Sequence, residues 1–119
     1  MGFAHHGHYL AWCEMARTEH MRRLGVRYRD LEERGVRLAV ADAHLRYAKP
    51  ARYDDALTVT AWLTEAGSRR LAFGYRIERA DDGATLATAE TTLVSIDAQG
   101  RPARLPEDVI ARLEAILDA

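Results

Sequence analysis

The stretch Tyr9–Leu24, YLAWCEMARTEHMRRL, lies near the start of the chain and decides its fold. It contains neither glycine nor proline, and it is followed by Gly25, a typical residue just beyond the last turn of a helix. Arg22 and Arg23 near its end suit the negative pole of a helix dipole. We therefore predict a long helix over this stretch.

The first half of the predicted helix, YLAWCEMA, is apolar on every side except at Glu14. A helix that is apolar all round belongs in a protein core, so we expect this one to be buried. A carboxylate inside such an element needs a partner, which Arg17 or a group on the sheet would supply. This structural role of Glu14 is favoured over a contact with substrate.

The remainder of the chain changes from helical to alternating periodicity. A second short helical stretch, YRDLEERG, ends at Gly35, and beyond it apolar residues recur at every second position. Four strands are predicted, at positions 36–50, 57–64, 71–77 and 85–96. Turn signals separate the last three, at Gly67-Ser68 and Asp81-Asp82-Gly83. A final helix opens at the LPED segment, with an apolar face formed by Val109, Ile110, Leu113, Ile116 and Leu117.

A buried helix followed by long antiparallel strands indicates the α+β class, in which a curved antiparallel sheet wraps around a long central helix. The 119 residues suffice for one domain with a single modest core, so we expect one domain over residues 1–119. A sheet of four strands leaves exposed edges, which are usually covered or paired in an oligomer.

Composition narrows the class of protein further. A formal net charge of −1 disfavours nucleic-acid binding, which usually requires a basic excess. The one cysteine, Cys13, cannot form an internal disulfide, which fits a reducing cytoplasm. No apolar run approaches the roughly 20 residues that span a bilayer. No basic and apolar leader is visible either, so membrane insertion and secretion are not expected.

Three histidines gather just before the long helix, in MGFAHHGHY. His5, His6 and His8 have tight spacing but no indicated fourth ligand, so we expect no metal site here. His5 and His8 are interpreted as loop residues with local hydrogen bonds. His6 is favoured as a functional residue, the alternative being a histidine that caps the helix.

Two blocks of the sequence, GFAHHGHYLAWCEMARTEHMRRLG and RYAKPARYDDALTV, carry a resemblance to a known family. The chain resembles the hotdog-fold acyl-CoA thioesterases of the 4-hydroxybenzoyl-CoA thioesterase type. The first block matches that family at Gly2, His6, Tyr9, Trp12, Glu14, Ala16 and Arg17. The second block matches it at Arg46, Tyr47, Pro50, Ala51, Tyr53, Asp54 and Asp55.

The resemblance implies hydrolysis of an acyl-CoA thioester by a homodimer or homotetramer whose active sites are shared between subunits. Coenzyme A is then part of the substrate, and no separate cofactor is expected. By the same likeness, the catalytic aspartate of the family would fall two residues before Met1, and the first strand of the family would precede it. Neither is present in this chain, which is consistent with Met1 being an internal methionine of a longer protein.

The likeness also implies a set of catalytic residues: His6, Gly7, Tyr9 and Glu14. The oxyanion would be held by the backbone N–H of His6 or its neighbour at the start of the helix. Gly7 would let the substrate approach the backbone closely, and the His6 side chain would orient water or act as a base near neutral pH. Glu14 is the carboxylate nearest in sequence to these residues, but it lies two turns into the helix and is not expected to reach the thioester carbon.

Thioester substrates of this kind carry phosphates, which favour arginine and lysine. Arg69 and Arg70, in a turn between strands, form one candidate cluster for contacting coenzyme A. Lys49 and Arg52, with Arg46 nearby, form another around Pro50. The acyl group would lie against the helix face, beside Tyr9, Trp12 and Cys13, and Cys13 is interpreted as a core residue with no sign of activation as a nucleophile.

A second function remains open: a hotdog module that binds acyl-CoA or an acyl carrier without turning it over. An in-frame strand ending in an aspartate just before Met1 would favour the enzyme, whereas a stop codon there would favour the binding module. A hotdog dehydratase is disfavoured because its different Asp/His motif is not found. Aromatic, short-chain and medium-chain acyl groups are all compatible with the sequence.

Overall fold

The computed structural model describes residues 6–52 and 55–118, without the side chain of His6. In chain order, the elements are α1 (His6–Arg23), α2 (Tyr28–Glu33), β1 (Arg37–Tyr47), β2 (Leu57–Ala66), β3 (Arg70–Arg79), β4 (Thr85–Ile96) and α3 (Glu107–Asp118). The four predicted strands and the predicted final helix are therefore confirmed, with shifts at their ends.

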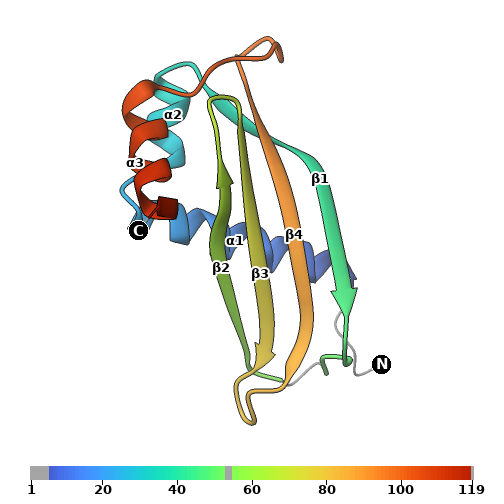
Figure 1. Cartoon of the computed structure of the whole chain (residues 1–119). Coiled ribbons are helices and arrows are strands. Elements are labelled where there is room, and N and C mark those ends of the chain that lie inside the picture. The colour runs from blue at the N-terminus through green and yellow to red at the C-terminus, as the bar shows by residue number, and fades with distance from the viewer. Residues whose placement is uncertain (1–5, 53–54, 119) are drawn as a thin grey trace.

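The strands form one antiparallel sheet in the order β1-β4-β3-β2, so β1 and β2 are its edges. Figure 1 shows α1 crossing one face of this sheet, with α2 and α3 gathered near one end. The other face of the sheet carries no helix among the described residues. This arrangement confirms the predicted α+β class with a sheet packed on a long helix.

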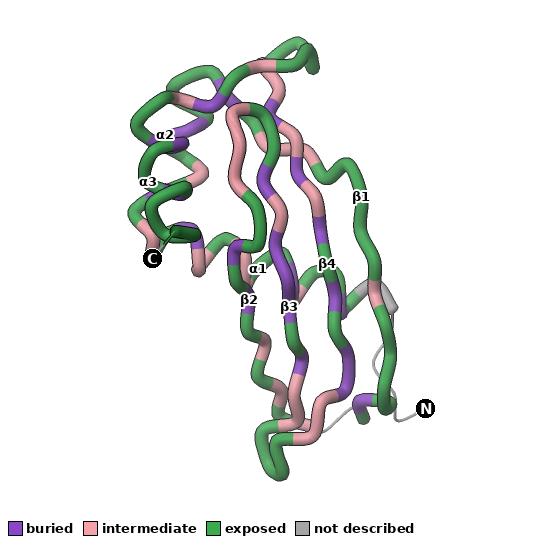
Figure 2. Tube along the Cα trace, viewed as in Figure 1, coloured by how far each residue is buried: buried purple, intermediate pink, exposed green. Residues whose placement is uncertain are grey.

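The core lies between α1 and the sheet. Leu71, Phe73, Tyr75 and Ile77 all point to this side, as their alternation predicts, and none is more than 1% exposed. Figure 2 shows buried positions along much of β3 and β4, with intermediate and exposed positions between them. Burial of each such side chain contributes about 1.5–3 kcal/mol to folding, so this inner face holds the sheet on the helix.

Helix α1 begins at His6, three residues earlier than predicted, and ends at Arg23. Gly25 has a φ of +87°, which confirms its role in ending the helix, because an L side chain adopts this conformation rarely. The start at His6 places the segment His6-Gly7-His8 in the first turn, so these residues belong to the helix and not to a loop before it.

The expectation that α1 is buried on all sides is wrong. Tyr9, Cys13 and Met21 are buried against the sheet, but Met15 is 69% exposed and Glu14 is exposed as well. The physical reason is that one sheet covers one side of the helix, and the described chain supplies no second layer. Glu14 is therefore a solvated carboxylate, and among the described residues its side chain forms neither the hydrogen bond nor the ion pair expected with Arg17 or the sheet.

Two other expectations need correction at element ends. Strand β1 ends at Tyr47, before the predicted end near Pro50, and it contains a register shift between Val40 and Asp42. In α3, Val109, Ile110 and Leu113 are buried as predicted, whereas Ile116 and Leu117 are 36% and 38% exposed because the last turn extends beyond the sheet's cover.

A buried polar contact fixes α1 on the sheet. The Tyr75 hydroxyl lies 2.6 Å from the Thr91 hydroxyl, and Arg17 of α1 donates to the Tyr75 oxygen at 3.3 Å. Tyr75 and Thr91 are both buried, and the Thr91 hydroxyl depends on Tyr75 for its partner. The contact specifies which position on α1 faces the middle of the sheet.

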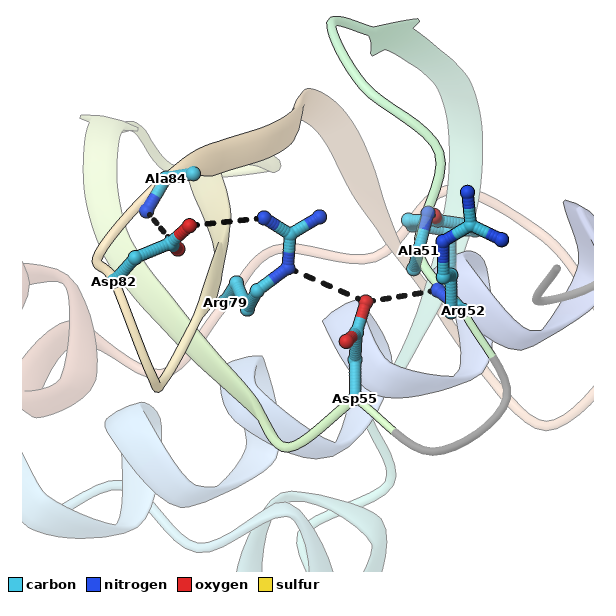
Figure 3. Close-up of polar contacts among 7 residues, drawn as sticks. Ala51, Arg52, Asp55, Arg79, Asp82 and Ala84 are labelled. Atoms are coloured by element: carbon cyan, nitrogen blue, oxygen red, sulfur yellow. Dashed lines mark hydrogen bonds and ion pairs between the residues drawn. The ribbon is translucent and has the colours of Figure 1, made fainter. Parts of the chain in front are cut away.

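A second polar network joins two turns at one end of the sheet (Figure 3). Asp55 accepts from the backbone N–H of Arg52 at 2.8 Å and from Nε of Arg79 at 3.4 Å. Arg79 also donates to Asp82 at 3.0 Å, and Asp82 in turn accepts from the Ala84 N–H at 3.0 Å. The loop after β1 is thereby tied to the hairpin between β3 and β4, and these contacts lower the pKa of both carboxyl groups.

Membrane insertion was also not expected from the sequence. In the described ranges, no helix combines the length and the apolar character needed to cross a bilayer.

We expect Tyr75→Phe to lower the free energy of unfolding by about 1–3 kcal/mol, because the buried Thr91 hydroxyl loses its partner. Thr91→Val should cost a similar amount. The double variant should cost less than the sum of the two, since neither buried hydroxyl is then left behind. Urea unfolding of the four proteins measures this coupling, and strictly additive losses would contradict the role given to the pair.

The hydrogen bonds of Asp55 lead to a second prediction, about how the stability of the protein depends on pH. Because the folded-state pKa of Asp55 is lowered, its contribution is present above the unfolded-state value near 3.9 and is lost as the pH falls through the folded-state pKa. Asp55→Asn should therefore lower the thermal midpoint at pH 7 and flatten the loss of stability below about pH 4. Asp81→Asn, at an exposed position of the neighbouring turn, is the matched control. An unchanged acid slope in Asp55→Asn would refute this account.

Candidate active site

The first turn of α1 supplies the backbone groups that the resemblance assigns to the oxyanion. The first N–H groups of a helix have no partner within the helix, and here they include those of His6, Gly7 and His8. No acidic residue lies in this turn, so the positive end of the helix dipole is not neutralised by its own side chains. The His6 side chain, and all of His5, lie outside the described residues.

Tyr9, a predicted catalytic residue, is 1% exposed and lies in the core. Its hydroxyl accepts a hydrogen bond from the backbone N–H of Ala51 at 3.3 Å. Its ring makes edge contacts with Tyr47 and Trp12, at centroid distances of 5.1 and 5.2 Å. Tyr9 thus joins the two blocks of sequence that carry the family resemblance, and it ties the start of α1 to the loop after β1.

Tyr47 is a candidate that sequence reasoning missed as a site residue. It ends β1, its ring packs edge-on against Tyr9, and it is 49% exposed. Partial desolvation raises the pKa of its hydroxyl, and the neighbouring Tyr9 adds to the effect. The residue keeps its proton at neutral pH and can donate a hydrogen bond. The available signal was its place in the second block, one residue after Arg46.

A groove of about 480 Å³ runs between α1 and strand β2, at the free edge of the sheet. The groove is lined by Trp12, Met15, Ala16, Asp55, Leu57 and Val59. Of the residues expected beside the acyl group, Trp12 faces the groove, whereas Tyr9 and Cys13 are inside the core. Burial raises the pKa of the Cys13 thiol to about 11 against the opposing effect of Arg17, so the thiol stays protonated.

Glu14 does not line this groove. It borders a separate hollow of about 180 Å³ between α1, α2 and β1, together with Arg17, Thr18, Met21, Tyr28 and Leu38. The structure therefore places the predicted carboxylate on another side of the helix from Trp12 and Met15. Within this chain, Glu14 and the groove are not brought together.

The two candidate clusters for coenzyme A lie at opposite ends of the sheet. Lys49 and Arg52 are exposed in the loop that Tyr9 holds against the start of α1. Arg69 and Arg70 are exposed at the hairpin between β2 and β3, where Arg70 forms an ion pair with Glu65 at 3.4 Å. Tyr47 pairs with Ala87 and Arg70 with Val94, which lie seven residues apart on β4, or roughly 23 Å.

Of the three histidines near the start of α1, His8 is the one whose side chain the structure describes. His8 is exposed, and its ring lies 6.0 Å from that of Trp12. Among the described residues, no group of three His, Cys, Asp or Glu side chains is placed to hold a metal ion. His5 and the His6 side chain are outside that search.

Both the sequence and the fold of this chain are similar to those of known proteins. The chain is 31% identical to the acyl-CoA thioester hydrolase YbgC of Escherichia coli, over 95% of this chain and 84% of that protein. It is 35% identical to YneP of Bacillus subtilis and to sll0410 of Synechocystis, but it spans 56% and 58% of the length of these relatives.

Solved structures also resemble this chain over most of its length. The hypothetical protein TT1821 from Thermus thermophilus has a TM-score of 0.87 and 36% identity, over 97% of this chain and 87% of that one. A DHNA-CoA thioesterase from Staphylococcus aureus has a TM-score of 0.88 and 27% identity, over 99% and 83%. The model of the thioesterase-like superfamily matches residues 1–113, and the chain therefore belongs to that superfamily.

Proposed function

We propose that this protein hydrolyses acyl-CoA thioesters to a free acid and coenzyme A. The observation that carries the proposal is the hydrogen bond from the Ala51 N–H to the Tyr9 hydroxyl. It brings the loop with Lys49 and Arg52 to the positive end of α1, where an oxyanion would be stabilised. Membership of the thioesterase-like superfamily supports this activity at the level of the family.

In the proposed reaction, a water oxygen attacks the thioester carbonyl carbon while His6 takes its proton. The carbonyl oxygen becomes an oxyanion held by N–H groups at His6 and Gly7, in the first turn of α1. The carbon–sulfur bond then breaks as the carbonyl re-forms, and the sulfur of coenzyme A leaves and takes up a proton. His6 suits both proton transfers because the ordinary pKa of histidine is near neutral.

The proposed acyl group lies towards Trp12 in the apolar groove beside β2. A volume of about 480 Å³ is compatible with aromatic, short-chain and medium-chain acids, so 4-hydroxybenzoyl-CoA is one substrate to test among several. The phosphates of coenzyme A are assigned to Lys49 and Arg52, and Arg69 and Arg70 remain the competing prediction.

We further propose that the protein works as a homodimer or homotetramer. The exposed apolar side chains of Leu10, Met15 and Val40 support this, because they leave α1 and the β1 edge uncovered in a single chain. Apolar surface and strand edges of this kind are commonly covered by a second copy.

The first test is release of free coenzyme A thiol from benzoyl, 4-hydroxybenzoyl, short-chain and medium-chain acyl-CoA. We expect turnover, and we expect His6→Ala to reduce kcat by about 100-fold or more, because a general base is lost. His20→Ala is the matched control, since His20 lies on the same helix about 21 Å further along. Equal loss in both variants would argue against a catalytic role of His6.

A chain that binds acyl-CoA without any turnover would contradict the enzyme and favour the alternative, a binding module for acyl-CoA or an acyl carrier. Equilibrium binding of a non-hydrolysable acyl-CoA thioether, measured on the same preparation, separates this outcome from a protein that does not recognise the substrate.

The position of coenzyme A gives a further prediction. Replacing Lys49 and Arg52 together by alanine should raise KM for acyl-CoA about tenfold with little change in kcat, because contacts to distant phosphates bind ground state and transition state alike. Arg101→Ala, at an exposed loop position, controls for the loss of positive charge. A rise in KM on replacing Arg69 and Arg70 instead would move the phosphates to the other end of the sheet.

A further inference from the structure

The face of the sheet opposite α1 contains a hollow of about 460 Å³ that draws residues from all four strands. Its lining includes Arg46 on β1, Trp62 on β2, Gly74 and Arg76 on β3, and Thr88 and Glu90 on β4. The proposed thioesterase reaction uses none of them, and they lie on the opposite side of the sheet from the Tyr9 contact. The hollow therefore needs its own explanation.

Trp62 forms a flat aromatic surface in this hollow. It pairs with Gly74 across the two strands, and a Cβ atom on Gly74 would lie 2.7 Å from two carbons of the indole ring. The ring therefore occupies the space above Gly74, which only a residue without a side chain leaves free. With Trp62 still 40% exposed, the ring can stack with a planar group from solvent.

Two arginines flank a hydroxyl in the next row of the sheet. Thr88 pairs with Arg76 on one side and with Arg46 on the other, so the two arginines start about 10 Å apart on the same face. Arg76 forms an ion pair with Glu78 at 3.1 Å. Within the described part of the chain, no ion pair or hydrogen bond engages the Arg46 guanidinium. An anion above Thr88 would be within reach of both cations.

Glu90 adds an acceptor beside the aromatic surface. It pairs with Gly74, so its exposed carboxylate starts next to the position that the Trp62 ring covers. The row of Trp62, Gly74 and Glu90 lies two residues from the row of the arginines, or about 7 Å. The hollow thus offers a stacking surface and a hydrogen-bond acceptor at one end, and two cations with a hydroxyl at the other.

We propose that this hollow binds an adenine nucleotide. The base stacks on Trp62 with its exocyclic amine donating to Glu90, and the phosphate lies over Thr88 between Arg46 and Arg76. One ribose separates base from phosphate, as the spacing of the two rows requires. The source is either a free nucleotide or the adenosine phosphate end of a coenzyme A molecule, which share this chemistry. The site is separate from the proposed hydrolytic site and does not depend on it.

The test is calorimetric titration of the full chain with AMP, ADP, coenzyme A, adenosine and inorganic phosphate. We expect saturable binding of AMP, with Trp62→Ala weakening it about tenfold or more through loss of base stacking. The double variant Arg46→Ala and Arg76→Ala should weaken AMP binding but leave adenosine binding unchanged. Arg101→Ala, outside the hollow, should bind AMP as the unmodified chain does.

The two sources separate in the same experiment. Tighter binding of AMP or ADP than of coenzyme A identifies a free nucleotide, and the reverse order identifies coenzyme A, provided Trp62→Ala weakens that binding. Glu90→Gln should weaken AMP binding but not binding of inosine monophosphate, which lacks the exocyclic amine.

Several results would overturn the proposal. These are no saturable AMP binding at about millimolar concentration, equal affinity in Trp62→Ala, or equal binding of phosphate alone. A fourth is dissociation of an oligomer in Trp62→Ala without any nucleotide effect, which would make this face an interface between copies. Circular dichroism of each variant shows that it is folded, and Trp62→Phe, which keeps a stacking ring, should retain most of the affinity.

Discussion

The hydrogen bond between the Tyr9 hydroxyl and the Ala51 N–H is the contact on which the candidate site depends. It lies in a place where water is excluded, since Tyr9 and Ala51 are each 1% exposed. An unpaired buried N–H would cost about 1–3 kcal/mol, so the loop after β1 is held to the first turns of α1. The Asp55–Arg79 bridge fixes the other end of that loop, and Arg52, between these two contacts, is exposed.

The second constraint is that α1 covers one face of a single sheet. It explains why apolar side chains remain exposed on α1 and why the groove along β2 is open. It also explains the polar outer face, where threonines, arginines and one tryptophan alternate with the buried residues of the same strands. Both faces of the molecule that we associate with ligands result from this one-sided packing.

Most of the fold could be predicted from the sequence, because alternation over strands and helix-ending glycines are local signals. Leu71, Phe73, Tyr75 and Ile77 are all on the face that the alternation indicates. The exposure of Glu14 could not be predicted in this way, because the apolar sequence of a helix does not determine how many sides of that helix are covered by other elements. Tertiary packing decided that point.

The candidate site was less predictable, because it depends on register and on contacts between distant segments. Composition alone does not distinguish Lys49 and Arg52 from Arg69 and Arg70 as phosphate contacts. The strand pairing along β4 shows that these two pairs of cations lie roughly 23 Å apart. The contacts of Tyr47 and Trp62 could not be predicted from the sequence for the same reason. Alternation indicates the face on which each lies, but the Tyr9 ring and the absent side chain of Gly74 determine what each can contact.

The charge state of Asp55 bears on the proposed chemistry. Asp55 is the carboxylate among the residues that line the groove, so it is the first carboxylate to consider as a base under the proposed function. Its oxygen is engaged by Arg79 and by the Arg52 N–H, and these contacts lower its pKa. A carboxylate stabilised in this way is a weak base and a poor nucleophile, because both roles require it to give up the contacts that stabilise its charge. Under the proposed function, proton transfer in this chain therefore rests on His6 and water.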